Sequence, residues 1–128
     1  MSITGAESVN LRLPAAAPSA AVVRYCLRRF AQEQALSQQR AFDLLVVVGE
    51  AVANAIEHAY RPITGEACFE VRVWRAGDAI TARVRDYGRW RGPSTAIDRG
   101  RGLMIIGSVA RTYSISALRD GTAVEMTL

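Results

Sequence analysis

The spacing of apolar residues changes period along the chain, and each change marks a predicted element. Residues 9–13 alternate apolar and polar side chains, which predicts a short strand ended by a proline. From about residue 19 to residue 36 apolar side chains recur every three or four positions, which predicts a helix. A second helix is predicted from Ser37, whose hydroxyl can cap it, to about Tyr60, shortly before Pro62.

The period then falls to two. Residues 67–75 and 79–85 each alternate apolar and polar side chains, and they flank Gly77-Asp78, so they predict a β-hairpin. The polar positions of both strands are rich in arginine. We therefore expect helices to cover only one face of the sheet.

A glycine-rich stretch, residues 86–102, shows no apolar periodicity. Helical spacing resumes over 103–110, and two last strands, 113–119 and 122–128, flank the hairpin signal Asp120-Gly121. Helices and strands in this order, without regular βαβ alternation, predict a two-layer α/β sandwich with a mixed, mostly antiparallel sheet and helices on one face. We expect residues 1–128 to form a single domain with residues 1–8 as a flexible extension.

Composition places the chain among globular proteins. Half of the 128 residues are hydrophobic and 22% are charged. The longest apolar run, residues 44–53, is interrupted by Glu50 and is too short to cross a bilayer. The N-terminus lacks the features of a secretory signal. We expect a cytoplasmic protein that does not contact membranes.

All sixteen basic residues are arginines, and the formal net charge is +4. This charge favours acidic or phosphate-bearing partners but does not by itself indicate nucleic-acid binding, and none is predicted. The absence of lysine excludes a Walker-type phosphate loop. The two cysteines, Cys26 and Cys68, lack metal-ligand spacing, so we expect buried thiols and no zinc site.

Three polar residues form a stripe along the second predicted helix. Glu50, Asn54 and His58 lie at i, i+4 and i+8, so they share one side of a helix that is otherwise apolar. Burying these groups without partners costs several kcal/mol each. A metal ion with bound phosphates would suit the stripe, because asparagine supplies an oxygen ligand and glutamate can accept a proton. The alternative is the exposed edge of an amphipathic helix, with His58 compensating the helix dipole.

Three further segments carry candidate chemistry. Asp86-Tyr87-Gly88 ends a strand, where the carboxylate can accept a hydrogen bond from an exocyclic amine; a plain turn is the alternative. Gly100-Arg101-Gly102-Leu103 opens a helix, so its backbone N–H groups, assisted by Arg99, suit phosphate; a flexible loop is the alternative. Thr122 follows Gly121 and is an ordinary strand residue when taken alone.

Together and in this order the segments resemble the GHKL ATPases, which include histidine kinases, gyrase, Hsp90 and bacterial anti-sigma-factor serine kinases. The run Glu50 to Tyr60 resembles the N box in its anti-sigma form, E-x-x-x-N-x-x-x-H-A-Y. Asp86-Tyr87-Gly88 resembles the start of the G1 box, and Arg99 to Leu103 the G2 box. Gly121-Thr122 matches the family's late Gly-Thr, and the resemblance spans about residues 9–128. The fold it implies is the Bergerat-type sandwich.

The resemblance implies roles for individual residues. Asn54 would ligate Mg²⁺ that bridges the ATP phosphates, and Glu50 would be the general base for the attacking hydroxyl. Asp86 would bind the adenine amine with Thr122 beside it. The rest of the implied nucleotide-binding set is His58, Gly88, Gly100, Arg101, Gly102 and Leu103.

Two departures from the family pattern concern the segment over the nucleotide. Trp90 occupies the position of the second glycine of the fuller G1 box. Only eleven residues separate Gly88 from Gly100, which predicts a short ATP lid. One hypothesis is that Trp90 packs over the nucleotide.

Within the family, the chain is most similar to the anti-sigma serine kinases, which act in bacterial transcription and stress responses. We expect neither the phosphoacceptor helices of a histidine kinase nor a transducer domain in it. The resemblance implies phosphorylation of a serine or threonine on an anti-anti-sigma (STAS) partner, and a possible homodimer. The alternative is a nucleotide-dependent module that binds a sigma factor with little or no kinase activity, related to domains fused to PP2C-type phosphatases. Arg24, Arg28 and Arg29 form either a docking face for an acidic partner or a solvated helix face.

Overall fold

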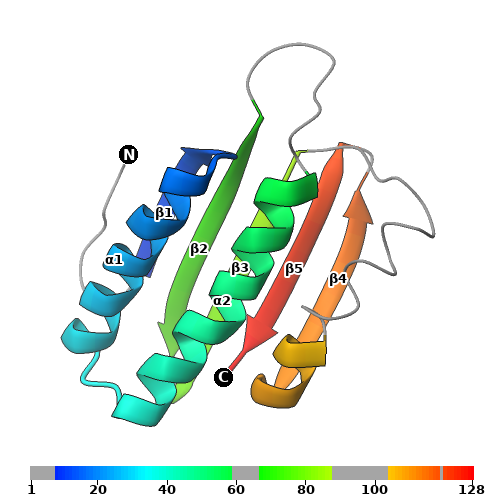
Figure 1. The fold of residues 1–128 in the computed structure, drawn as a ribbon. Helices are drawn as coiled ribbons and strands as arrows, with labels where there is room; N and C mark the ends of the chain where they lie inside the picture. The colour runs from blue at the N-terminus through cyan, green and yellow to red at the C-terminus, as the bar shows by residue number, and fades with distance from the viewer. Residues whose placement is uncertain (1–7, 59–66, 88–103, 119) are drawn as a thin grey trace.

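The computed structural model describes residues 8–58, 67–87, 104–118 and 120–128 (Figure 1). The elements follow the predicted order. They are β1 (Ser8–Pro14), α1 (Ala17–Glu33), α2 (Gln38–His58), β2 (Cys68–Ala76), β3 (Ala79–Asp86), a short helix at 104–109, β4 (Thr112–Leu118) and β5 (Gly121–Thr127).

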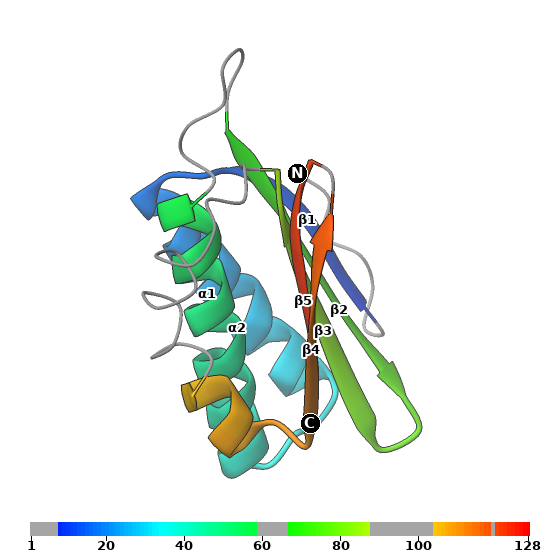
Figure 2. The ribbon, with the colours of Figure 1, turned by 90° about the vertical axis from the view of Figure 1, so that its right-hand side faces the viewer.

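The strands form one five-stranded sheet in the order β1-β2-β3-β5-β4. Every neighbouring pair is antiparallel, where the sequence prediction allowed for a mixed sheet. The helices lie on one face of this sheet and leave the other face uncovered (Figures 1 and 2). The predicted two-layer α/β sandwich is therefore confirmed.

One hydrophobic core fills the space between the two layers. The strands supply side chains at every second position, such as Val71 of β2 and Val84 of β3, which the register places opposite each other. The helices supply residues three or four apart, such as Phe30 of α1 and Val48 of α2. Each of these buried side chains contributes about 1.5 to 3 kcal/mol relative to its exposed state.

Local signals in the sequence explain where the helices begin and end. The backbone N–H of Arg40 donates to the Ser37 hydroxyl at 3.1 Å, so Ser37 caps α2 as predicted. α1 ends at Glu33, three residues before the predicted end, and the chain turns through Ala35 with a φ of 53°. α2 is described as far as His58, and its predicted end at about Tyr60, before Pro62, lies outside the described residues.

Both cysteines are free thiols, but only one is buried. Cys26 of α1 lies in the core, and burial raises the pKa of its thiol. Cys68 is half-buried, so the expectation of a fully buried thiol there is wrong. Within the described part of the chain, neither α1 nor α2 has the combination of length and hydropathy that a membrane-spanning helix needs.

Candidate functional site

The polar stripe on α2 lies at the border between the buried and open sides of the helix. Glu50 and Asn54 are half-buried, whereas Ala51 and Ala55 beside them are 2% exposed. The backbone of His58 completes the helix, but its side chain lies outside what the structure describes. Glu50 and Asn54 are therefore one turn apart on a single side of α2.

A narrow pocket of about 10 Å³, partly open to solvent, lies between the end of α2 and the sheet. It brings together Asn54 from α2, Asp86 from the end of β3 and Thr122 from the start of β5. The rest of its lining is apolar: Ala51, Ala55, Val84, Ile115 and Val124. Three polar residues that are far apart in the sequence thus meet in one small, mainly apolar site, as ligand sites commonly require.

Asp86 is a buried carboxylate, with 6% of the residue exposed. It lies opposite Thr122 in the β3–β5 register, and the backbone N–H of Thr122 donates to its Oδ1 at 3.2 Å. A buried carboxylate needs such donors because its desolvation is otherwise costly. This hydrogen bond fixes the Asp86 side chain at the wall of the pocket.

Gly121 allows this close approach between β3 and β5. A Cβ atom on Gly121 would lie 1.9 Å from the carbonyl oxygen of Asp86, and the residue has a φ of +153°. Both facts exclude any other residue without a shift of the backbone. The sequence singled out Thr122 of the Gly-Thr pair, and the structure shows that its glycine is equally necessary.

Thr122 is 2% exposed, and its hydroxyl Oγ1 has no hydrogen-bond partner among the described residues. Leaving a buried hydroxyl unpartnered costs about 1 to 3 kcal/mol. Because Thr122 lines the pocket beside Asp86, its hydroxyl is available to a ligand that enters there. The pocket therefore offers a carboxylate, a hydroxyl and a carboxamide at a single site.

The family model of the histidine kinase-like ATPase domain matches residues 13–128. The chain belongs to this family. The predicted resemblance to GHKL ATPases is thereby confirmed, and family membership implies ATP binding.

A solved structure supports the same assignment. The chain is similar to the crystal structure of the RsbU and RsbW domains of Rv1364c from Mycobacterium tuberculosis, with a TM-score of 0.77 and 26% identity. The match covers 94% of this chain but only 31% of that one, so the ATPase domain corresponds to a part of the larger protein. This neighbour agrees with the predicted anti-sigma group of the family. No curated protein matches the chain.

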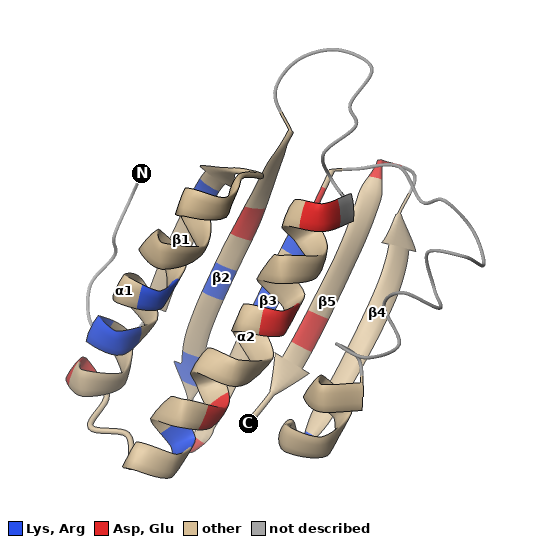
Figure 3. Cartoon of the chain, viewed as in Figure 1, with Lys and Arg blue, Asp and Glu red and all other residues tan. Residues whose placement is uncertain are grey.

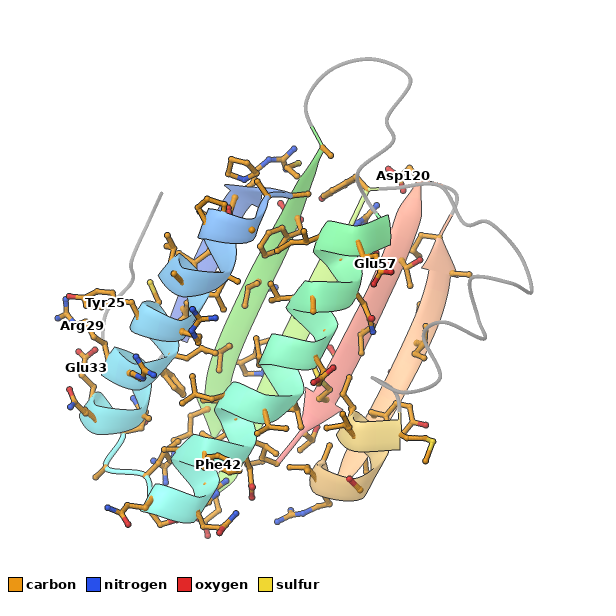
Figure 4. The ribbon with its side chains drawn as sticks, viewed as in Figure 1. Tyr25, Arg29, Glu33, Phe42, Glu57 and Asp120 are labelled. Atoms are coloured by element: carbon orange, nitrogen blue, oxygen red, sulfur yellow. The ribbon has the colours of Figure 1, made fainter. Side chains whose placement is uncertain are left out.

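The remaining predicted site residues of the ATPase domain divide into two groups. Gly88, Trp90, Gly100, Arg101, Gly102 and Leu103 lie outside the described residues. Arg24, Arg28 and Arg29 are exposed on α1, which packs over β1 and β2 on the far side of α2 from the pocket (Figure 1). Arg29 projects away from the sandwich (Figure 4). The structure does not bring these arginines into the pocket.

The donor set of the pocket suits a metal ion that arrives bound to a nucleotide. The described residues contain no group of three His, Cys, Asp or Glu side chains that could hold a metal ion by themselves. Mg²⁺ in phosphate sites takes only one or two protein ligands, with phosphates and water completing its octahedron. Asn54 at the pocket, together with the unpartnered Thr122 hydroxyl, fits a nucleotide that brings most of the metal ligands itself.

Sequence reasoning missed a cluster behind the pocket, centred on Tyr87. The Tyr87 hydroxyl donates to Glu70 Oε1 at 2.5 Å. The guanidinium carbons of Arg12 and Arg85 lie 5.2 and 4.4 Å from the centroid of its ring. The hydrogen bond to Glu70, then burial, raises the pKa of Tyr87. The cluster holds the residue directly after Asp86, and its only sequence signal was an aromatic residue among arginines at alternate strand positions.

Proposed function

We propose that this ATPase domain binds Mg-ATP in the Asn54–Asp86–Thr122 pocket and phosphorylates a serine or threonine of a STAS-type anti-anti-sigma partner. The observation that carries the proposal is the meeting of these three side chains at one end of the sandwich. Family membership supports the nucleotide. The partner and the phosphoryl acceptor rest on the resemblance of the Glu50–Tyr60 run to the anti-sigma N box and on the RsbW-containing neighbour.

The sheet side of the pocket suits an adenine ring. The Asp86 carboxylate can accept a hydrogen bond from the exocyclic amine, and Thr122 Oγ1 can bond a ring nitrogen or a bridging water. Val84 and Val124 line the same space and provide apolar contact for the ring faces. Recognition of an amine by a buried carboxylate discriminates strongly against bases that present a carbonyl there.

The helix side of the pocket suits the phosphates. Bound Mg-ATP supplies the γ-phosphoryl group and the cation that neutralises its developing charge. Asn54 would hold that cation through its side-chain oxygen. Glu50, one turn earlier on α2, would accept the proton of the attacking hydroxyl. Arg101 and the neighbouring glycines would cover the phosphates from the segment outside the described residues.

A second candidate is a nucleotide-dependent module that binds a sigma factor or regulator and transfers phosphate slowly or never. One observation favours it: Glu50 does not line the pocket in the described structure. On either account Arg24, Arg28 and Arg29 are the candidate docking face for an acidic partner, because three exposed arginines lie on one helix.

Phosphorylation of a STAS protein in the presence of Mg-ATP separates the two candidates. We expect phosphoserine or phosphothreonine with the wild type and a rate reduced about 100-fold or more in Glu50→Gln, since a general base contributes that much. The ATP dissociation constant of Glu50→Gln should change little. Glu57→Gln is the matched control, because Glu57 is an exposed glutamate of the same helix (Figure 4). Absence of phosphorylation by the wild type, with partner binding unchanged in Glu50→Gln, would leave only the binding module.

A further inference from the structure

Most of the arginines in the strands lie on the outer face of the sheet, opposite the helices. Residues of β2 and β3 alternate between the core and this outer face, so Arg72, Arg83 and Arg85 all lie on it together with Glu70. Figure 3 shows the blue segments on β2 and β3, and Figure 2 shows that no helix covers this side. The four side chains line a shallow hollow of about 180 Å³ that is open to solvent.

Two acidic groups near the hollow, Glu70 and Asp120, are already engaged. Glu70 accepts hydrogen bonds from Arg12 Nη1 at 3.0 Å and from the Tyr87 hydroxyl at 2.5 Å. Arg85 is paired with Asp120 at 2.5 Å. Glu70 and Asp120 therefore neutralise Arg12 and Arg85. The other two arginines of the outer face are uncompensated in the sense that they form no ion pair with any described residue.

Arg72 and Arg83 are these two uncompensated arginines. The Arg72 Nε donates to the neutral side-chain oxygen of Asn10 at 3.0 Å, and its guanidinium stacks 5.2 Å above Trp74. Arg83 is half-buried and has no hydrogen-bond or ion-pair partner among the described residues. Glu125 is its cross-strand neighbour on β5 but forms no ion pair with it in the described structure.

The register places Arg72 directly opposite Arg83. Directly opposed like charges destabilise a strand pair, so this arrangement costs free energy in the isolated domain. A bound anion between the two guanidinium groups would reverse that cost, because each can form charge-assisted, bidentate hydrogen bonds with a carboxylate. Two opposed arginines are typical of a site that binds an oxyanion, whereas a structural ion pair needs residues of opposite charge.

We propose that the outer face of the sheet, centred on Arg72 and Arg83, binds an acidic segment of a partner protein. Arg83 and Arg85 are two positions apart on β3, a spacing of about 6.7 Å that matches alternate side chains of an extended chain. A partner strand with carboxylates at alternate positions would therefore meet successive arginines. A second copy of this chain is disfavoured as occupant, because face-to-face contact would bring the arginines of two copies together.

Fluorescence anisotropy tests the proposal with a short labelled peptide of alternating glutamate and threonine, at low ionic strength. We expect binding to the wild type, about tenfold weaker binding to Arg83→Gln and to Arg72→Gln, and no binding of the matched glutamine–threonine peptide. Arg111→Gln is the control, because it removes the same charge from an exposed arginine that lies outside β2 and β3. It should change the affinity less than twofold.

Three results would overturn the proposal. Equal weakening by Arg111→Gln and Arg83→Gln would mean that only net charge attracts the peptide. Binding of inorganic phosphate that Arg83→Gln weakens, without binding of the glutamate peptide, would indicate a small-anion site. Dimerisation that Arg83→Gln abolishes, measured by analytical ultracentrifugation, would assign the face to a second copy. ATP binding of each variant is measured in parallel, so failure here is distinguishable from failure of the nucleotide site.

Discussion

Two adjacent residues, Gly121 and Thr122, set the geometry between β3 and β5 where the pocket lies. The glycine brings the backbone of β5 against the carbonyl of Asp86, and the threonine N–H then reaches the Asp86 carboxylate at 3.2 Å. The lack of a side chain at Gly121 and the backbone N–H of Thr122 thus both hold β5 close to Asp86. The Gly-Thr pair therefore has a steric reason in addition to any contact with nucleotide.

The first prediction concerns Gly121→Ala. The new methyl group would overlap the Asp86 carbonyl, and the residue would have to leave its φ of +153°. We expect a loss of about 2 to 6 kcal/mol in the free energy of unfolding, from overpacking plus backbone strain. Denaturant unfolding measures it. Gly49→Ala is the matched control: its Cβ meets nothing within 4 Å in α2, and it should stabilise the protein by about 1 kcal/mol. Equal effects of the two substitutions would contradict the steric account.

The second prediction concerns Thr122→Val, which removes the unpartnered hydroxyl and keeps the shape of the side chain. Without ligand we expect the variant to be as stable as the wild type or more stable by up to about 1 kcal/mol. ATP should bind it about tenfold more weakly, because the hydroxyl contact is lost. Calorimetry provides both values. Thr81→Val, on the outer face of β3, should leave ATP affinity unchanged. A destabilised Thr122→Val protein with normal ATP affinity would show that the hydroxyl is structural.

At the scale of elements, the end of β3 is held from both sides of the sheet. On the inner side Asp86 bonds to β5, and on the outer side Tyr87 bonds to Glu70 of β2 while Arg85 pairs with Asp120. Figure 4 places Asp120 at the start of β5 and Glu57 at the end of α2, both at the same end of the sandwich. The strand end that carries Asp86 is thereby fixed before any ligand binds.

The third prediction concerns Tyr87→Phe and its pH dependence. The folded-state pKa of Tyr87 is raised, chiefly by its hydrogen bond to Glu70 and then by burial. Its contribution to stability is thus fully present below the unfolded pKa of about 10 and is lost as the pH rises through the folded value. We expect Tyr87→Phe to cost about 1 to 2 kcal/mol at neutral pH. Unfolding midpoints between about pH 9 and about pH 11 should fall more steeply for the wild type than for the variant. Parallel pH profiles would contradict this role for Tyr87.

The elements were predictable from the sequence because their signals are local. Alternation located the strands, and Ser37 marked the start of α2 through a hydrogen bond to a backbone group three residues away. Where packing sets the end of an element, its observed boundary differs from the predicted one by one to three residues. β5, for example, begins at Gly121 rather than at residue 122, because Gly121 pairs with Leu118 across the β4–β5 hairpin.

At the scale of the whole molecule, the antiparallel sheet brings the ends of β3 and α2 and the start of β5 to one end of the sandwich. Asn54, Asp86 and Thr122 are predictable as a set from their motifs, and the pocket confirms that they lie together. The Tyr87 cluster and the opposed Arg72 and Arg83 were not predictable. They depend on cross-strand register, which no single segment of the sequence contains.

The two proposed binding sites, one for the nucleotide and one for an acidic partner, lie on different faces of the molecule. The Asn54–Asp86–Thr122 pocket, which we propose binds the nucleotide, opens at one end of the helix-covered layer. Arg72 and Arg83 lie on the face of the sheet that no described helix covers. A partner on the outer face would therefore leave the pocket open. Changes at Arg72 or Arg83 should consequently leave ATP affinity intact, and changes at Asn54 should leave peptide binding intact.

Isothermal titration of ATP with and without Mg²⁺ tests the central claim most directly. We predict that Mg²⁺ strengthens binding to the wild type and that Asn54→Ala removes this dependence while remaining folded. Asn10→Ala, on the outer face, is the matched control and should behave as the wild type. If Asn54→Ala binds ATP with the same affinity and the same Mg²⁺ dependence as the wild type, the assignment of the pocket to Mg-ATP is wrong.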